Sequence, residues 1–274
     1  MTATITRLSE VADRYDAVVF DQWGVLHNGT TPYAGAVSAV RDLGDLGVRA
    51  AVLSNSGKRA APNAARIADM GLPEAWFTQV MTSGEALWRD VAAGVVSERV
   101  FHAVERAPGD AAGWAEGLDI GFADLDGAEA LLVMGLPDGA ALSAWRPVLD
   151  AALARGMPLY CSNPDRKSPR AGGTVISPGA LAFEYKGMGG DVVFYGKPHR
   201  PIFSALQTAL GTDRLLMVGD SLEHDIAGAV GAGWDSLFVA GGLYADRFAA
   251  GLTLDALVAE TGHPAPTYMI GELQ

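Results

Sequence analysis

The sequence predicts an α/β protein built on a parallel sheet, and three observations support this fold class. Short apolar runs of strand length alternate with segments of helix length along the chain, which is the pattern of a parallel sheet flanked by helices. Glycine or proline ends most of the helical segments. The chain has 274 residues and is 49% hydrophobic, which is enough for one large domain or two smaller ones.

The first third of the chain begins this sheet. Residues 17–20 form an apolar run that predicts a buried strand, and a Gly-rich turn then leads to a helix over 34–46. Residues 50–53 predict a second buried strand. The helix that follows is expected to end where Gly71 and Pro73 interrupt the pattern.

The middle third differs in composition and supplies its own set of elements. Alanine, glycine and tryptophan become more frequent from about Thr82, and the spacing of Thr82 and Glu85 predicts a capped helix start. Apolar runs predict strands over 100–104, 130–134 and 159–162, with a helix over 142–154. We therefore predict an inserted cap domain over 82–186, within a core domain formed by 1–81 and 187–274.

The last third resumes the strand pattern and is expected to complete the core sheet. Strands are predicted over 191–195, 215–218 and 237–240. Pro201 suits the first turn of a helix that reaches residue 210, and a further helix is expected over 254–261.

Composition and charge exclude several classes of function. A formal net charge of −12 argues against a nucleic-acid partner, since such binding depends on clustered Lys and Arg. No apolar run is long enough to span a bilayer and the N-terminus does not resemble a signal peptide, so no membrane partner and a cytoplasmic location are expected. The single cysteine, Cys161, excludes an intrachain disulfide. Several tryptophans could pack at a subunit contact, which leaves a homodimer open.

Polar residues follow four of the predicted strands directly. Ligands of parallel α/β sheets bind at the carboxyl ends of the strands, so these residues are the best candidates for a site. Taken singly, each could be a turn residue or a helix cap. Together they bring carboxylates, hydroxyl and amide donors and one cation to the same edge. The four segments are Asp21-Gln22-Trp23-Gly24, Ser54-Asn55-Ser56, Gly196-Lys197-Pro198 and Gly219-Asp220-Ser221, the last with Asp225.

This combination of side chains suits the transfer of a phosphoryl group. Such a group spreads negative charge over its oxygens, and catalysis depends on positioning and electrostatic stabilisation. Asp21 and Asp220 would repel each other and the phosphate unless a hard dication bound between their oxygens. Lys197 would add a positive charge, and the Ser54 hydroxyl with the N–H after it would add neutral donors. Asp225 would hold a water beside the ion.

At these residues the chain resembles the haloacid dehalogenase superfamily, in particular its class IIA branch of sugar- and nucleotide-phosphatase-like proteins. The resemblance covers nearly the whole chain, and its motifs are specific in this order and spacing. It implies a Rossmann-like parallel sheet core with an inserted α/β cap domain. The matching segments are Asp21-Gln22-Trp23-Gly24-Val25-Leu26, Ser54-Asn55, Gly196-Lys197-Pro198 and Gly219-Asp220 with Asp225, together with Asn163-Pro164-Asp165 in the cap.

The resemblance implies a hydrolase that removes phosphate from a small phosphorylated metabolite with the help of Mg²⁺. Asp21 would be the nucleophile that becomes an aspartyl phosphate, and Lys197 would balance charge. Asp21, Asp220 and the backbone carbonyl of Trp23 would be ligands of Mg²⁺, with Asp225 behind them.

The resemblance also assigns the residues that would hold the substrate. Ser54 and Asn55 would bind its phosphate. Asn163 and Asp165, from the cap triplet, would face the part of the substrate that is not phosphate.

The chain departs from the family pattern at Trp23. The second Asp of the first motif usually protonates the leaving oxygen and then activates water, and an indole cannot exchange a proton in this way. The metal ligand at this position is a backbone carbonyl, which any residue provides. General acid–base catalysis typically contributes about 10²–10⁴-fold, a small part of the total acceleration, so the departure weakens phosphomonoesterase activity without ruling out phosphoryl transfer.

Three functions stay open on the sequence alone. The first is a phosphatase whose leaving group is already acidic, or whose proton comes from another residue, with His27, His199, His224 and Asp165 as candidates. The second is a phosphotransferase that passes the phosphoryl group to an acceptor other than water. The third is a Mg²⁺-dependent protein that binds a phosphorylated metabolite with little or no turnover, as a sensor or scaffold.

Overall fold

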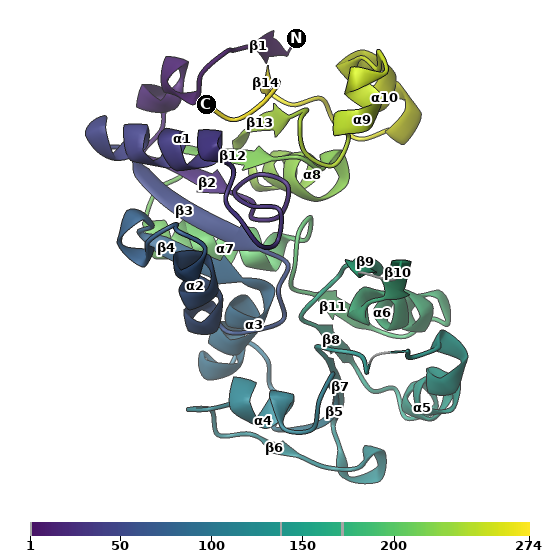
Figure 1. Ribbon diagram of the computed structural model, residues 1–274. Helices are drawn as coiled ribbons and strands as arrows, with labels where there is room; N and C mark the ends of the chain where they lie inside the picture. Colours follow the sequence, from purple (N-terminus) through teal and green to yellow (C-terminus); the bar gives the residue numbers. More distant parts are fainter. Residues whose placement is uncertain (1, 138, 171–172) are drawn as a thin grey trace. The chain divides into compact units, whose positions relative to one another are not determined.

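The computed structural model describes residues 2–137, 139–170 and 173–274, which form two compact units (Figure 1). The first unit contains the segments up to residue 54, 61–81 and 197–274. The second unit contains residues 55–60 and 82–196. None of the helices in the described ranges has the length and apolar character needed to cross a membrane.

The sheet of the first unit has seven strands in its described part. The order in which successive strands are added reverses beside β2. From β2 the chain continues to β3 and β4 on one side, whereas β12, β13, β14 and β1 lie on the other. Neighbouring strands from β1 to β3 are parallel. The switch point therefore lies between β2 and β12, where ligands of such sheets bind. In sheet order the strands are β1 (Ala3–Thr4), β14 (Tyr268–Ile270), β13 (Asp235–Val239), β12 (Leu215–Gly219), β2 (Ala17–Phe20), β3 (Arg49–Ser54) and β4 (Gln79–Thr82).

Both faces of this sheet are covered, which explains the continuous apolar runs of its strands. Phe20 on β2 packs in a cluster with Val40 of α1, on one face. Phe238 on β13 packs in a different cluster with Leu222 and Leu257. The helical segments are η1 (Leu8–Glu10), η2 (Ala12–Arg14), α1 (Ala34–Asp45), α2 (Ala60–Asp69), η3 (Glu74–Trp76), α7 (Arg200–Leu210), η5 (Leu222–Ile226), α8 (Ala227–Ala232), α9 (Ala245–Ala249) and α10 (Leu254–Thr261).

The second unit has its own parallel sheet and its own core. Tyr185 is fully buried there, and its hydroxyl donates to the carbonyl of Met157 at 2.7 Å. The sheet order is β11 (Val192–Phe194), β8 (Leu159–Cys161), β7 (Ala130–Val133), β5 (Val100–Val104) and β6 (Gly121–Phe122), and β9 (Lys167–Arg170) pairs with β10 (Gly173–Ile176) in an antiparallel hairpin. The helices are α3 (Ser83–Ala92), α4 (Asp110–Trp114), η4 (Leu125–Gly127), α5 (Leu142–Ala154) and α6 (Pro178–Gly187).

The α/β class and the parallel sheets are confirmed, but one strand joins a different sheet from the one expected. The strand predicted over 191–195 exists as β11, and it pairs with β8 through Val193 and Tyr160. The contacts therefore group residues 187–196 with the second unit, whereas the predicted boundary placed them in the core. That the two units are separate domains stays a prediction.

Candidate active site

Asp21 and Asp220 follow neighbouring strands at the switch point of the first unit's sheet. Asp21 comes directly after the buried run of β2, and its backbone N–H donates to the carbonyl of Val218 on β12 at 2.9 Å. Asp220 comes directly after Gly219, the last residue of β12. Because β2 and β12 are parallel neighbours, their carboxyl ends bring the two side chains to the same edge.

Asp225 reaches the same place from a turn of π-helix, η5. Its backbone N–H and that of Ile226 both donate to the carbonyl of Ser221, at 3.0 and 3.2 Å. The Oδ2 atom of Asp225 accepts from the N–H of Ser221 at 3.1 Å, so the side chain also caps the turn. π-Helical turns are rare and are often found at functional sites. Gly219 permits this approach, since a Cβ there would lie 2.2 Å from the Cβ of Asp225.

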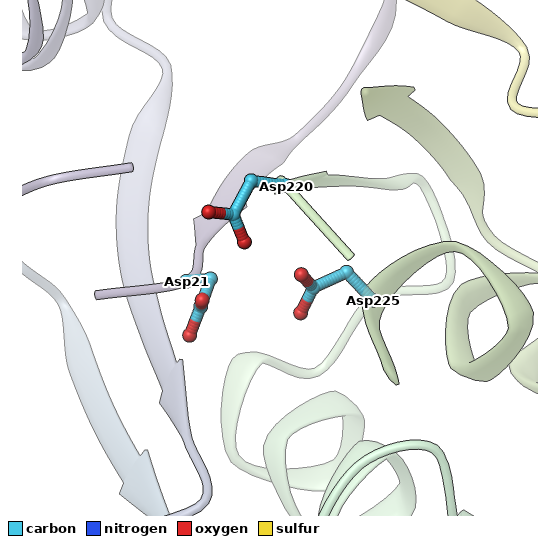
Figure 2. Close-up of side chains that lie close together, drawn as sticks. All are labelled: Asp21, Asp220 and Asp225. Atoms are coloured by element: carbon cyan, nitrogen blue, oxygen red, sulfur yellow. The ribbon is translucent and has the colours of Figure 1, made fainter. Parts of the chain in front are cut away.

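The three carboxyl groups form one cluster (Figure 2). One oxygen from each of Asp21, Asp220 and Asp225 lies within 4.8 Å of the other two. Asp220 and Asp225 are buried, and Figure 2 shows the three side chains close together at the end of β2 and the segment after β12. Oxygen donors at this separation are the ligand set that hard divalent cations prefer.

Lys197 lies buried against this cluster. Its Nζ donates to Oδ1 of Asp21 at 2.6 Å and to Oδ1 of Asp225 at 2.7 Å, and its side chain is only 3% exposed. Burial alone would lower the pKa of Lys197, but the charges of Asp21 and Asp225 raise it above the usual value. The ammonium group therefore stays charged over the whole physiological range.

A single ammonium does not neutralise three carboxyl groups. The pKa of Asp220 is raised to about 8, first by burial and then by the charges of Asp21 and Asp225. Burial likewise raises the pKa of Asp21. Protonation of Asp220 is how the cluster lowers its own repulsion, and a bound dication would relieve the same repulsion while keeping the carboxylates ionised. The residues present therefore fit a divalent cation.

Backbone groups hold the carboxyl group of Asp220 closely on several sides. The N–H of Leu243 donates to its Oδ2 at 2.8 Å. A Cβ at Gly24 would lie 1.9 Å from this Oδ2, and a Cβ at Gly242 would lie 2.4 Å from it. The sequence interpretation did not assign Gly242 or Leu243 to the site, although two glycines directly after a predicted strand were a signal for a close backbone approach.

Trp23 is two residues after Asp21 in the chain. Its side chain is 49% exposed. The indole lies over Gly29, where a Cβ would be 3.3 Å from Nε1. An indole brings no titratable group to the site, and the role of the Trp23 carbonyl as a metal ligand stays a prediction.

The histidines proposed as proton donors differ in their surroundings. His27 is buried, and its Nδ1 accepts from the N–H of Gly29 at 3.0 Å. Burial, followed by the charge of Arg66, lowers the pKa of His27, which favours the neutral imidazole, so less of His27 carries the proton that a general acid must donate. Nδ1 of His224 lies 3.3 Å from the Ser221 hydroxyl. His199 is the residue before α7.

The other predicted site residues are divided between the two units. Ser54 is the buried last residue of β3 in the first unit. Asn55, Asn163 and Asp165 belong to the second unit. There, Nδ2 of Asn55 donates to Oδ1 of Asp165 at 2.8 Å, a contact that the sequence did not indicate. The roles of these four residues in binding a substrate stay predictions.

Comparison with known proteins agrees with this architecture. A curated relative, the 5′-nucleotidase YutF of Bacillus subtilis (strain 168), is 28% identical over 236 residues, which are 82% of this chain and 87% of the relative. A haloacid dehalogenase-like hydrolase from Brucella suis 1330 superposes with a TM-score of 0.81 at 29% identity, over 98% of this chain and 100% of the other. A p-nitrophenyl phosphatase from Archaeoglobus fulgidus has a TM-score of 0.76 at 25% identity, over 94% and 97% of the two chains.

Two family profiles match the segments that carry the site. Residues 18–110, which include Asp21, match the haloacid dehalogenase-like hydrolases. Residues 194–265, which include Lys197, Asp220 and Asp225, match a second profile described as HAD-hydrolase-like. With both halves of the acidic cluster inside these matches, the chain belongs to the haloacid dehalogenase-like family, in its class IIA branch, and is a hydrolase.

Proposed function

We propose that the protein is a Mg²⁺-dependent phosphatase that acts on a small phosphorylated metabolite through an aspartyl phosphate at Asp21. The observation that carries this proposal is the cluster of Asp21, Asp220 and Asp225, whose oxygens lie within 4.8 Å of one another. The relatives named as a 5′-nucleotidase and a p-nitrophenyl phosphatase support phosphate esters as the substrate class. A cytoplasmic location and a homodimer stay predictions from the sequence.

The chain's own residues supply the charges that the site needs. Asp21, Asp220 and the backbone carbonyl of Trp23 would hold Mg²⁺, with Asp225 supporting them from the π-helical turn. When bound, the ion offsets the repulsion between carboxylates and phosphate and draws electron density from a phosphoryl oxygen. Lys197 holds Oδ1 of Asp21 at 2.6 Å, which fixes the direction of the carboxyl group and favours its ionised form.

The reaction then proceeds in two displacements. A carboxylate oxygen of Asp21 forms a bond to phosphorus while the bond from phosphorus to the ester oxygen breaks, and its electron pair leaves with that oxygen. Water next attacks the phosphorus of the aspartyl phosphate. Inorganic phosphate is released, the Asp21 carboxylate is restored, and the proton lost by water balances the proton taken up by the leaving group. The Ser54 hydroxyl and the N–H that follows it would donate to the phosphate oxygens in both steps.

Trp23 narrows the range of good substrates. The indole cannot protonate the leaving oxygen, so esters whose leaving group is stable as an anion, such as aryl and acyl phosphates, should react best. Alkyl phosphates need a proton from another residue or from water. This preference would follow directly from the absence of a titratable side chain at position 23.

The proposal is tested by phosphate release from a panel of aryl, acyl and alkyl phosphates, with Mg²⁺ and with EDTA. We expect release that requires Mg²⁺, is fastest for aryl and acyl esters, and is abolished by Asp21→Asn. Asp45→Asn, at an exposed aspartate of the same unit, is the matched control. Tight Mg²⁺-dependent ligand binding without release would favour a binding protein instead. Transfer of phosphate to an added alcohol in preference to water would favour a phosphotransferase.

A further inference from the structure

The loop that follows Ser54 is built into the second unit. The N–H of Gly84, at the start of α3, donates to the carbonyl of Ser56 at 3.1 Å. The Thr82 hydroxyl donates to the carbonyl of Lys58 at 2.5 Å. These bonds hold the backbone of residues 55–60 against the first turn of α3, so the loop has little freedom of its own.

Close packing fixes the same loop from other directions. A Cβ at Gly84 would lie 2.1 Å from the carbonyl oxygen of Gly57. A Cβ at Gly57 would lie 2.8 Å from the carbonyl oxygen of Met134 and 2.9 Å from Oγ of Ser162. Only glycine fits at either position. The loop is therefore seated on the carboxyl ends of β7 and β8 as well as on α3.

The side chain of Asn55 is held at both ends of its amide group. Nδ2 donates to Oδ1 of Asp165 at 2.8 Å, in a partly buried bond to a charged acceptor. Oδ1 lies against Gly196, where a Cβ would be only 2.7 Å away. Hydrogen bonds to an ionised acceptor are stronger than neutral ones, so this contact selects one rotamer of Asn55.

Asp165 is itself rigidly placed. Its N–H donates to Oδ1 of Asn163 at 3.0 Å, and its carbonyl accepts from the N–H of Gly179 at 3.0 Å. A Cβ at Gly179 would lie 2.0 Å from the carbonyl oxygen of Pro164, so α6 begins in close contact with the Asn-Pro-Asp segment. The backbone of Asp165 is thus held by Asn163 on one side and by the start of α6 on the other.

We propose that Asp165 is a positioning residue, which orients the amide of Asn55 for the phosphate and does not itself contact the substrate. This inference rests on the proposed function and on the role that the family resemblance assigns to Asn55, namely phosphate binding, with a side-chain amide N–H of Asn55 as a donor in addition to its backbone N–H. A side chain already held in its binding rotamer loses less conformational entropy when the ligand arrives. The Asn-Pro-Asp segment then acts on phosphate affinity through Asn55.

The experiment compares Asp165→Ala, Asp165→Asn, Asn55→Ala and the double variant Asn55→Ala/Asp165→Ala, each with Mg²⁺. Asp119→Ala, at an exposed aspartate of the same unit, is the charge-matched control. Affinity for inorganic phosphate is measured by calorimetry, and KM and kcat with p-nitrophenyl phosphate. We expect Asp165→Ala to weaken phosphate binding roughly tenfold, the effect of losing a hydrogen bond to a charged group, and to raise KM more than it lowers kcat. Asp165→Asn keeps an oxygen acceptor and should retain most of the affinity.

Non-additivity is the decisive result. If Asp165 acts through Asn55, the double variant binds phosphate no more weakly than Asn55→Ala alone. The NMR signal of the Asn55 side-chain amide is identified by its absence in Asn55→Ala. This signal should also broaden or shift in Asp165→Ala but not in Asp119→Ala. If Asp165→Ala does not fold, Asp165→Ser takes its place in the cycle.

Opposite results overturn the inference. If the fold-losses of phosphate affinity in the two single variants multiply in the double variant, Asp165 acts independently of Asn55. If a folded Asp165→Ala variant has unchanged phosphate affinity, Asp165 has no role in phosphate binding. Absence of phosphate binding by the unaltered protein would also reject it. Failure of the proposed function is seen separately, as absence of phosphate release or as release that survives Asp21→Asn, neither of which depends on Asp165.

Discussion

Gly24 lies so close to Asp220 that a Cβ at position 24 would fall 1.9 Å from the Oδ2 atom of Asp220. Gly24 also has φ +87°, which favours glycine over any other residue. Gly24 thus permits the sharp turn after β2 and also leaves room for the Asp220 carboxylate. Backbone conformation and the charge cluster are therefore coupled at one residue.

Gly24→Ala should disturb both the turn after β2 and the placement of the Asp220 carboxylate. We expect the free energy of unfolding to fall by about 1–3 kcal/mol, because of the positive φ and the displaced carboxylate. Any stabilisation of the folded protein by Mg²⁺ should fall as well. Gly44→Ala is the control, since Gly44 lies in α1 with no atom within 4 Å of its would-be Cβ. Urea unfolding with and without Mg²⁺ measures both effects, and equal stabilities of the two variants would contradict this reading of Gly24.

Lys197→Met should destabilise the protein. The substitution leaves Asp21 and Asp225 without the ammonium that lies 2.6 and 2.7 Å from them, in a position that is 3% exposed. Removing one partner of a buried ion pair typically costs about 3–5 kcal/mol. The measurement is urea unfolding in EDTA, so that divalent cations do not compensate. Lys167→Met, at an exposed lysine, should leave stability nearly unchanged. A Lys197→Met variant as stable as the unaltered protein would show that the carboxyl groups are neutral without it.

Mg²⁺ should raise the Tm of the protein. A ligand that binds only the folded state adds about 2.7 kcal/mol at a concentration of 100 times its Kd. Asp220→Asn removes one charge from the cluster and should reduce or abolish this shift, whereas Asp45→Asn should leave it intact. Thermal unfolding at several Mg²⁺ concentrations, with EDTA as reference, provides the readout. Equal Mg²⁺ shifts in Asp220→Asn and in the unaltered protein would place the ion elsewhere.

Trp23→Asp should restore the missing proton donor. We expect faster hydrolysis of alkyl phosphates, with an upper limit set by the roughly 10²–10⁴-fold contribution of general acid–base catalysis. Trp23→Asn is the matched control, because it has nearly the same shape as aspartate and no titratable proton. Turnover of alkyl and aryl phosphates by both variants separates the effect of the added carboxyl proton from the effect of removing the indole. A folded Trp23→Asp variant with an unchanged or lower rate on alkyl phosphates would contradict the proposed role of position 23.

Glu85 should make stability depend on pH in the acid range. Burial would raise the pKa of Glu85, but hydrogen bonds from Arg59, Ala60 and Arg89 lower it below its usual value overall. A lowered pKa means that the ionised group stabilises the folded state fully above about pH 4.3, the usual glutamate value, and loses this effect as pH falls through the folded pKa. The stability difference between the unaltered protein and Glu85→Gln should therefore shrink as pH falls from 6 to 3.

Thermal unfolding across this pH range checks the prediction. Glu116→Gln, at an exposed glutamate of the same unit, should follow the unaltered protein at every pH. A constant difference between Glu85→Gln and the unaltered protein down to pH 3 would mean that Glu85 does not titrate in this range.

Much of the site could be predicted because its information is local. Asp21 and Asp220 each follow an apolar run, and parallel strands place such residues at one edge whatever the remaining topology. The N-terminal capping of helix α3 by Thr82 and Glu85 could be predicted in the same way, because a spacing of three residues defines it. The placement of Asp21 and Asp220 at one edge of the sheet follows from these local rules, whereas their close approach needs the pairing of β2 with β12.

Long-range pairing decided the rest. An apolar run such as 191–195 has the same pattern in either sheet, and only the tertiary structure shows that β11 pairs with β8. The bond between Asn55 and Asp165 joins residues 110 positions apart. The raised pKa of Asp220, about 8, depends on burial and on two neighbouring carboxylates, which no segment contains by itself. Periodicity and spacing act over a few residues, whereas burial and charge depend on which distant segments the folded chain brings together.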